Sequence, residues 1–195
     1  MSHSIVRPKR GYASARPAAT SPNFSEDPAT TVYTGWLQHF GAHGEVLAPE
    51  LEIGAGSVPV FFAASPRGAV TLWRGRTPTE ARLHARSVDR DGNPDGAVRD
   101  LPAEGQLYEL ALTSRSDGEA LVLFLEHHDD TMPNAWLLRA QALAPDATAR
   151  GEPTLLLSGE NTTSLRVLME ESGSRALVLY DGDGVRALPL RCVGR

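Results

Sequence analysis

The body of the chain, from Thr31 onward, consists of short apolar runs separated by clusters of Gly, Pro, Asp and Asn. No window keeps apolar residues at the i, i+3, i+4, i+7 spacing that is typical of a long amphipathic helix. Short strands bounded by turn residues produce the pattern that is seen instead. The sequence therefore predicts a body made mostly of β-strands.

Three nine-residue segments within this body align without a gap, at 65–73, 116–124 and 172–180. Each reads Ser, three turn-like residues, Ala, Val or Leu, a β-branched residue, Leu and an aromatic residue. Agreement at this many positions indicates a repeated structural unit. Residues that recur in register are expected in the core, and the aromatic ones, 51 and 56 residues apart, are Trp73, Phe124 and Tyr180.

Each segment is preceded by another apolar run, at 58–63, 107–113 and 165–169. A strand, a turn that contains Ser and Gly, and a second strand form a β-hairpin. The second strand of the middle repeat, near 120–125, is apolar nearly throughout, as expected when both faces of a strand are covered. We therefore expect the hairpins to pack sheet against sheet.

A more divergent unit lies between the hairpins. Third strands are expected, at spacings of 48, 55 and 50 residues, around Phe40, Val88, Leu143 and Val193. Fourth strands are expected near 46–53, 97–101 and 153–157. The chain then contains a third and a fourth strand, two complete sets of four, and a final set of three.

Four antiparallel strands that repeat about every 50 residues resemble the blades of a β-propeller. The resemblance covers 31–195 and is architectural, because the chain has no Trp-Asp dipeptide, no paired-glycine kelch signature and no full set of Asp-box residues. It implies an all-β fold of about three four-stranded antiparallel propeller-like blades.

Propellers usually have about four to eight blades, so three blades leave several arrangements open. Two chains could join into a six-bladed ring, since exposed strand edges favour association. The sheets could instead form an open or sandwich-like body, or the chain could be a remnant of a longer protein. The segment 46–53 is expected to supply the fourth strand that the last repeat, near 185–193, lacks.

The first thirty residues differ from the body, because they are rich in Ser, Pro, Ala and Arg and show no apolar periodicity. We expect a disordered, basic and Pro-rich arm at 1–30. The propeller-like β-repeat domain is expected at 31–195, with repeats near 58–101, 107–157 and 164–193, plus 33–53. A solvated tail is the simpler interpretation of the arm, and the alternative is a dock for an acidic partner made by Arg7, Lys9, Arg10 and Arg16.

The composition and charge of the chain argue against some classes of binding partner. A net charge of -5 and a pI near 5.7 argue against a protein that binds the phosphate backbone of nucleic acid. The single cysteine, Cys192, cannot form an intramolecular disulfide. No apolar run reaches the roughly 18 residues that span a bilayer, and no signal-peptide core follows the first cations. We therefore expect a cytoplasmic protein without nucleic-acid or membrane partners.

The run 126–130 carries imidazoles and carboxylates, which are metal-ligand types, at His127, His128, Asp129 and Asp130. Adjacent residues cannot all point at one ion. The equivalent connections of the other repeats, at 74–76 and 181–183, hold different residues. We expect a solvated loop here and no metal ion.

The segment 89–96 has oxygen-bearing side chains at alternate positions and resembles a calcium-binding loop. A Glu at the spacing that would close the calcium shell is missing. The segment also falls at a connection between third and fourth strands, where Asn, Asp and Gly are turn residues. Turn formation is therefore preferred to calcium binding.

Motifs of catalysis are missing from the sequence, which has no G-x-S-x-G, H-E-x-x-H, P-loop or dinucleotide-binding pattern. Cys192 lies in an apolar segment and is expected to behave as a small hydrophobe rather than as a nucleophile. We expect no enzyme activity, no catalytic residues and no cofactor. Trp36 and Trp136 fall outside the repeat register and are candidates for a surface anchor.

The propeller resemblance implies a functional face formed by the second-to-third and fourth-to-first connections. The expected function is a non-catalytic binding or scaffold module that holds a protein or peptide partner and can form a homodimer. A carbohydrate-binding, lectin-like module is the alternative, and a hydrolase is a third, less favoured one. The residues mapped to this polar face are Arg74, Arg76, Glu104, Gln106, His127, His128, Asp129, Asp130, Glu160, Asn161, Asp181 and Asp183.

Overall fold

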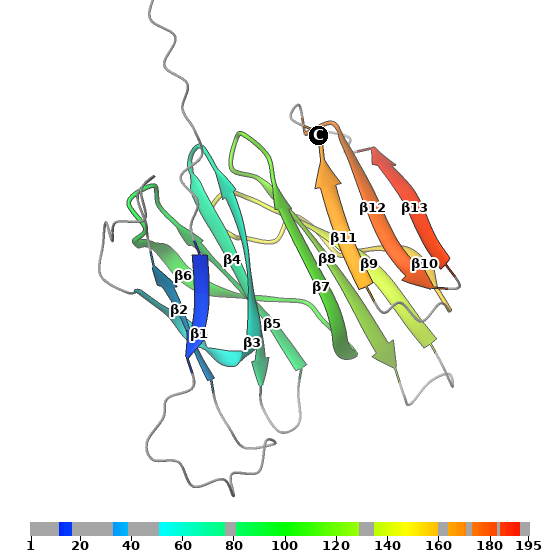
Figure 1. Ribbon diagram of the computed structural model, residues 1–195, viewed down its shortest axis with the longest axis horizontal. Helices are drawn as coiled ribbons and strands as arrows, with labels where there is room; N and C mark the ends of the chain where they lie inside the picture. Colours follow the sequence, from blue (N-terminus) through cyan, green and yellow to red (C-terminus); the bar gives the residue numbers. More distant parts are fainter. Residues whose placement is uncertain are drawn as a thin grey trace, which may run out of the picture.

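The computed structural model describes residues 12–16, 33–38, 51–76, 81–128, 135–159, 164–170, 173–182 and 184–191. Every helix or strand element within these ranges is a β-strand, so the expected all-β fold is confirmed (Figure 1). Over the same ranges there is no helix that could cross a membrane. The strands are β1 (Tyr12–Arg16), β2 (Tyr33–Gln38), β3 (Leu51–Ser65), β4 (Gly68–Arg76), β5 (Ala81–Val88), β6 (Pro94–Leu101), β7 (Gln106–Ser114), β8 (Ala120–His128), β9 (Ala135–Leu143), β10 (Thr154–Ser158), β11 (Ser164–Met169), β12 (Arg175–Gly182) and β13 (Gly184–Arg191).

Within each of three sheets, every strand pairs antiparallel with its neighbour in sequence. The first sheet contains β1 to β6, the second β7 to β10 and the third β11 to β13. In the first sheet, the N-terminal part of β3 pairs with β2 and its C-terminal part with β4, with an irregular register between Ser57 and Phe61. The strands β3–β6, β7–β10 and β11–β13 are therefore three comparable meanders.

The segments aligned by sequence occupy equivalent places in these meanders. They include the first part of β4, β8 and β12, each of which is the second strand of its meander. The expectation that their recurring aromatic residues are core positions is confirmed, since the structure buries Trp73, Phe124 and Tyr180.

One prediction near the start of the body is wrong. The sequence suggests separate strands at 46–53 and 58–63, whereas Leu51–Ser65 is one continuous strand. Gly54 and Gly56 lie inside this strand and pair with β2, and glycine within a strand often marks a bulge or bend rather than a turn. The N-terminal part of β3 consequently extends the first sheet and does not complete the third.

The expected arm at 1–30 lies outside the described residues except for Tyr12–Arg16, which form β1. This strand pairs with β2 as an edge of the first sheet, with Tyr12 opposite Gln38. Two of the expected third-strand positions, Phe40 and Val193, also lie outside the described residues.

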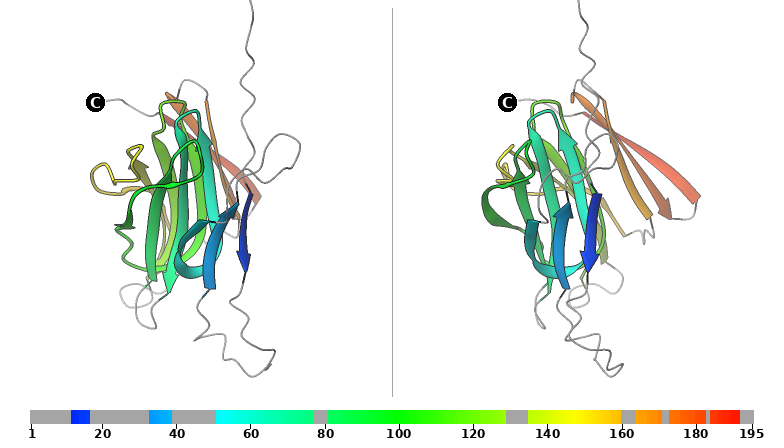
Figure 2. Two further views of the ribbon diagram at one scale, coloured as in Figure 1. Left: turned by 90° about the vertical axis from the view of Figure 1, so that its left-hand side faces the viewer. Right: turned by 60° about the vertical axis from the view of Figure 1, so that its left-hand side comes forward.

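The three sheets stack face to face, and the second lies between the other two (Figures 1 and 2). One core cluster joins Leu72 of the first sheet to Phe124 of the second. Another joins Leu123 of the second sheet to Val178 of the third. Successive residues of β8 enter different clusters because side chains alternate between the faces of a strand. Each fully buried side chain of this size contributes roughly 1.5–3 kcal/mol, so β8 holds both neighbouring sheets in place.

The first strands of the three meanders lie next to one another. β7 contacts β3 on one side and β11 on the other. Each meander therefore starts beside its neighbour and runs away from this shared seam toward its last strand. The last residues of the second strands β4, β8 and β12 consequently lie at one end of the stack. The described hairpin turns, at 66–67, 89–93, 115–119 and 144–153, lie at the other end.

The segment that resembles a calcium loop is a hairpin turn, as preferred from the sequence. The Asp89 N–H donates to the Asn93 carbonyl at 2.8 Å. The Asp89 carboxylate accepts bonds from the N–H groups of Asp91 and Asn93, each at 2.8 Å. These bonds, that from Asn93 first, hold the pKa of Asp89 below its usual value.

Candidate functional site

The structure describes some of the side chains mapped to the polar face. Glu104, Gln106, His127 and His128 come together at one end of the second sheet. Asp181 lies on β12 of the third sheet, opposite Ser164 and Val185. Of Arg76 only the backbone is described, and five further residues lie outside the described part of the chain: Asp129, Asp130, Glu160, Asn161 and Asp183.

Arg74 connects the first sheet to the second. Its guanidinium donates to the backbone carbonyl of Leu107 at 2.9 Å and to that of Tyr108. Burial lowers the pKa of Arg74, while the nearby Glu109 carboxylate raises it. The side chain thus holds the backbone of β7 at the point from which Tyr108 projects.

A buried carboxylate organises this end of the second sheet. Glu126 is fully buried, and its Oε2 lies 3.0 Å from Arg139 Nε and 3.5 Å from His128 Nε2. Its Oε1 accepts the backbone N–H of Glu104 at 2.8 Å. The exposed Glu104 carboxylate also contacts the Arg139 guanidinium, at 3.2 Å. We call Glu104, Glu126, His128 and Arg139 the ionic network.

The ionic network fixes the connection that enters the second sheet. A buried charge is tolerated only when it is paired and hydrogen-bonded, so Glu126 holds its partners in defined positions. Gly105 packs so closely here that a Cβ would lie 2.7 Å from the His127 carbonyl oxygen. The pairing of Glu126 with Arg139 is missing from the sequence prediction. The available signal was one carboxylate at the end of an apolar strand, a residue that needs a partner when it is buried.

On the opposite face of the same sheet end, three rings form what we call the aromatic patch: Tyr108, His127 and Trp136. The ring centroids of Tyr108 and Trp136 are 4.6 Å apart, and those of His127 and Trp136 are 4.5 Å apart. The Tyr108 ring meets His127 edge-on at 6.0 Å. Tyr108 is 40% exposed, and its hydroxyl donates to Gln106 Oε1 at 3.2 Å. Trp136, expected as a surface anchor, is half-buried within this patch.

A β-bulge explains why Tyr108 is exposed. Leu107 pairs with Glu126 and Glu109 with the adjacent Leu125, so Tyr108 is the extra residue of β7. Bulges redirect a side chain and are frequent next to functional sites. The sequence predicts a regular apolar strand here, and in the structure β7 does contact both other sheets. The bulge that exposes Tyr108 is not visible in the sequence.

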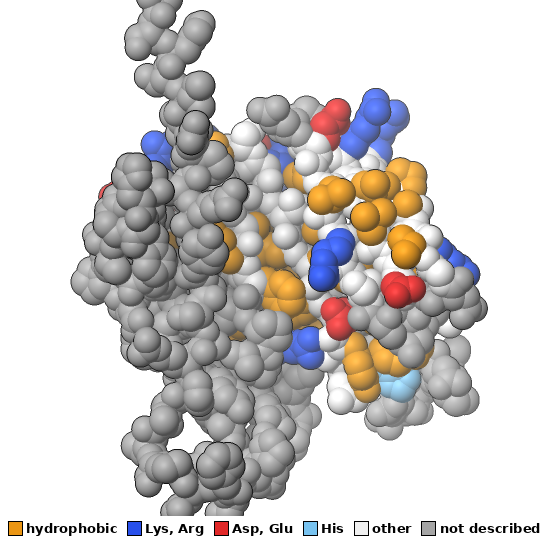
Figure 3. Space-filling model, in the orientation of Figure 1, with side chains coloured by type: hydrophobic (Ala, Val, Ile, Leu, Met, Phe, Trp, Pro, Cys, Tyr) orange, Lys and Arg blue, Asp and Glu red, His pale blue; other side chains and the backbone are white. Residues whose placement is uncertain are grey.

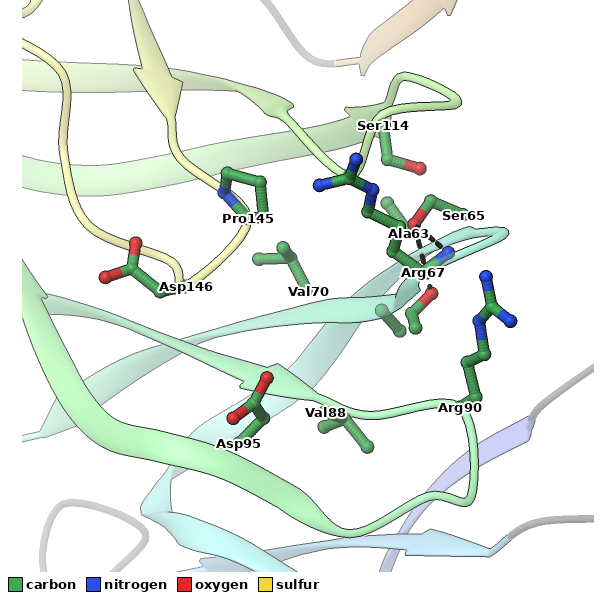
Figure 4. Close-up of a pocket in the computed structure, with 13 residues that line it drawn as sticks. Ala63, Ser65, Arg67, Val70, Val88, Arg90, Asp95, Ser114, Pro145 and Asp146 are labelled. Atoms are coloured by element: carbon green, nitrogen blue, oxygen red, sulfur yellow. Dashed lines mark hydrogen bonds between the residues drawn. The ribbon is translucent and has the colours of Figure 1, made fainter.

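The hollow described in the structure lies at the other end of the stack, among the hairpin turns. It is a groove of about 370 Å³ between the first and second sheets, with Ala63, Val70 and Val88 among its apolar lining. Figure 4 shows two arginines on one side of it, Arg67 and Arg90, and two acidic residues on the other, Asp95 and Asp146. None of the residues mapped to the polar face lines this groove.

Metal ligands do not converge in the described ranges, where no group of three or more His, Cys, Asp or Glu side chains could hold an ion. The described side chains thus offer two surfaces for contact. One is the aromatic patch beside the ionic network, and the other is the mixed-charge groove.

Comparison with known proteins adds little to this geometry. No protein-family model matches the chain, and no curated protein matches it. Among solved structures it is similar to Kuenenia stuttgartiensis hydrazine synthase, with 10% sequence identity and a TM-score of 0.46. The match covers 79% of this chain and 51% of that chain. A similarity at this level carries no argument about function.

Proposed function

We propose that the chain is a non-catalytic binding module that holds a protein or peptide partner through the aromatic patch. The observation that carries the proposal is the set of three rings that contact one another and are partly open to solvent. Tyr and Trp are enriched among residues that dominate binding energy in protein interfaces. The rings are already packed together, so a partner loses little of its affinity to ordering them.

The ionic network supports this role from the opposite face of the sheet. Arg139 contacts Glu104 and Glu126, and Glu126 also accepts the Glu104 N–H, so these groups already bond within the chain. Such contacts suit groups that keep a binding surface rigid, because β8 and β9 carry Glu126, His128 and Arg139 of the network as well as two of the rings. We assign Glu126 and Arg139 to positioning His127 and Trp136.

The stacking of the sheets favours a propeller-like arrangement as the setting of this surface. Consecutive meanders lie face to face, and their first strands are adjacent, as in the blades of a propeller. In that arrangement, the aromatic patch belongs to the end formed by the second-to-third and fourth-to-first connections.

A carbohydrate-binding module is the second candidate, and one observation favours it. The exposed Tyr108 ring has a polar rim, made by its own hydroxyl and the Gln106 amide. Sugar rings pack their C–H faces on aromatic rings while their hydroxyls bond to such polar groups.

The experiment is a selection of displayed random peptides against the full chain, followed by calorimetry, with a glycan array in parallel. We expect Tyr108→Ala to weaken the selected peptide by about tenfold or more, the effect of a central interface residue. Tyr108→Phe should keep peptide affinity, since the ring remains, and should weaken a glycan that uses the hydroxyl. Leu155→Ala, at an exposed leucine of β10, is the matched control. Equal losses for Tyr108→Ala and Leu155→Ala would contradict the proposal.

A further inference from the structure

The third sheet carries a second apolar surface, on the face that points away from the second sheet. Ala176, Val178 and Tyr180 of β12 enter the core, so the alternating Leu177 and Leu179 point outward. Pairing continues this row across the sheet. Leu168, Ala187 and Pro189 face outward with them, and we call these five side chains the outer apolar face. The exposed Arg166 of β11, opposite Leu179, also faces outward and borders it.

The outer apolar face is open to solvent. Leu168 is 58% exposed and Leu177 is 36% exposed. Figure 3 shows a cluster of hydrophobic side chains over the region of β11 to β13, bordered by charged ones. A contiguous apolar patch with a polar border is the usual mark of a contact surface.

The first and second sheets have no comparable exposed apolar face among the described residues. The second sheet is covered on both faces by its neighbours. In the first sheet, Thr71 and Trp73 lie on the face opposite to Leu72, and both are buried. Only the third sheet, among the described residues, thus combines an apolar outward row with exposure to solvent.

We propose that a second copy of this chain docks on the outer apolar face, sheet on sheet, about a two-fold axis that runs across the strands. The positions of the charged residues on this face favour a second copy of the chain as the binding partner. Arg175 lies at one end of β12 and Asp181 at the other, both on the outward side, with Val178 midway between them. The axis therefore places Arg175 of one copy opposite Asp181 of the second copy, and Leu177 opposite Leu179.

The other two-fold orientation is disfavoured. An axis parallel to the strands stacks Arg175 on Arg175, and like charges that meet in an interface weaken it. A six-bladed ring would place the outer apolar face against the first sheet of the second copy. Since Thr71 and Trp73 are already buried there, we favour contact between two third sheets.

The size of the surface sets the strength of the contact. Three strands about 4.8 Å apart and six residues of about 3.4 Å each give a footprint of roughly 14 by 20 Å. An interface of that size belongs to the small, transient class. We expect a reversible dimer with a dissociation constant in the micromolar range or weaker.

The first test measures the mass of the full chain by sedimentation equilibrium, from low-micromolar to millimolar concentration. The expected mass rises from that of one chain toward that of two. Leu177→Glu should keep the chain monomeric throughout, while the control Leu155→Glu, at a comparably exposed leucine of β10, should dimerise like the unmodified chain. A monomer at every concentration, or equal loss in the two variants, would overturn the proposal.

The second test exchanges charges and does not depend on Leu177. Arg175→Asp and Asp181→Arg should each weaken dimerisation by roughly tenfold, because each creates a like-charge contact across the axis. The double variant restores opposite charges and should restore the dimer. Circular dichroism of each variant checks that the fold is kept. A double variant as weak as the single ones would rule out the axis that runs across the strands.

Discussion

β8 and β12 share a nearly identical five-residue stretch but have different surroundings. Ala-Leu-Val-Leu-Phe begins at Ala120 in β8, and Ala-Leu-Val-Leu-Tyr begins at Ala176 in β12. In β8, both faces are buried between two sheets. In β12, one face is buried and Leu177 is exposed. The comparison teaches that this local sequence specifies a strand, and that the neighbouring sheets decide how much of it is covered.

The comparison predicts its largest effect at matched leucines. Leu123 is fully buried, and its counterpart Leu179 lies on the outward side of β12. Leu123→Ala should lower the free energy of unfolding by about 3–5 kcal/mol, through lost transfer energy and a cavity. Leu179→Ala should lower the free energy of unfolding by about 1 kcal/mol, because truncating a half-buried side chain removes less buried apolar surface. Urea denaturation of dilute protein measures the stability of both variants. Equal losses would show that the two leucines are equally covered, against the contrast drawn between β8 and β12.

A second prediction concerns the end of each strand, where β8 has Glu126 and β12 has Gly182. Glu126→Gln should lower the free energy of unfolding by about 3 kcal/mol, since it leaves Arg139 without its buried counter-charge. Glu104→Gln removes the exposed carboxylate of the same network and should cost less than about 1 kcal/mol. Thermal unfolding compares the two variants. If Glu126→Gln is as mild as Glu104→Gln, the network does not hold this end of the sheet.

Some of this organisation follows from sequence, and some does not. Local sequence patterns predict three features: the alternation of strands and turns, the register of the aromatic residues and the covered faces of β8. The partner of Glu126 lies on another strand, at Arg139, and the exposure of Tyr108 depends on the pairing of β7 with β8. Gly54 and Gly56 signal a break in the sequence, yet pairing with β2 carries the strand through them. Cross-strand registers decide these features, and a single sequence does not contain them.

At a third pair of positions the two strands should behave alike. Ala120 and Ala176 are both buried, the first against the first sheet and the second against the second sheet. Replacing either by Leu should overpack a core and cost about 1–3 kcal/mol. Thermal unfolding of both variants is the measurement. Unchanged stability in both would show that the alignment of the two segments is wrong.

The smallest expected effect depends on pH and sets the second sheet apart, because its β9–β10 turn has no counterpart after β13 among the described residues. The Asp146 carboxylate accepts the Thr148 hydroxyl at 2.8 Å and the Thr148 N–H at 3.1 Å. These bonds, with Arg99, hold the pKa of Asp146 below its usual value of 3.8. A lowered pKa stabilises the folded state above the unfolded pKa, and this stability is lost as the pH falls through the folded pKa.

Amide exchange of Thr148 tests this prediction. Protection of its N–H should decrease below about pH 4 relative to the rest of the second sheet, by a small factor because Asp146 is exposed. Asp146→Asn should remove the pH dependence. An unchanged dependence in the variant would assign the acid sensitivity to another group.

The most direct test of the contrast between the two strands is methyl NMR of leucine-labelled protein with a soluble paramagnetic probe, at low and at high protein concentration. We predict strong broadening of Leu177 in dilute solution, relief of that broadening in concentrated solution as two third sheets meet, and protection of Leu121 and Leu123 at both concentrations. Equal broadening of Leu121 and Leu177 in dilute solution would contradict the account, as would broadening of Leu177 that does not change with concentration.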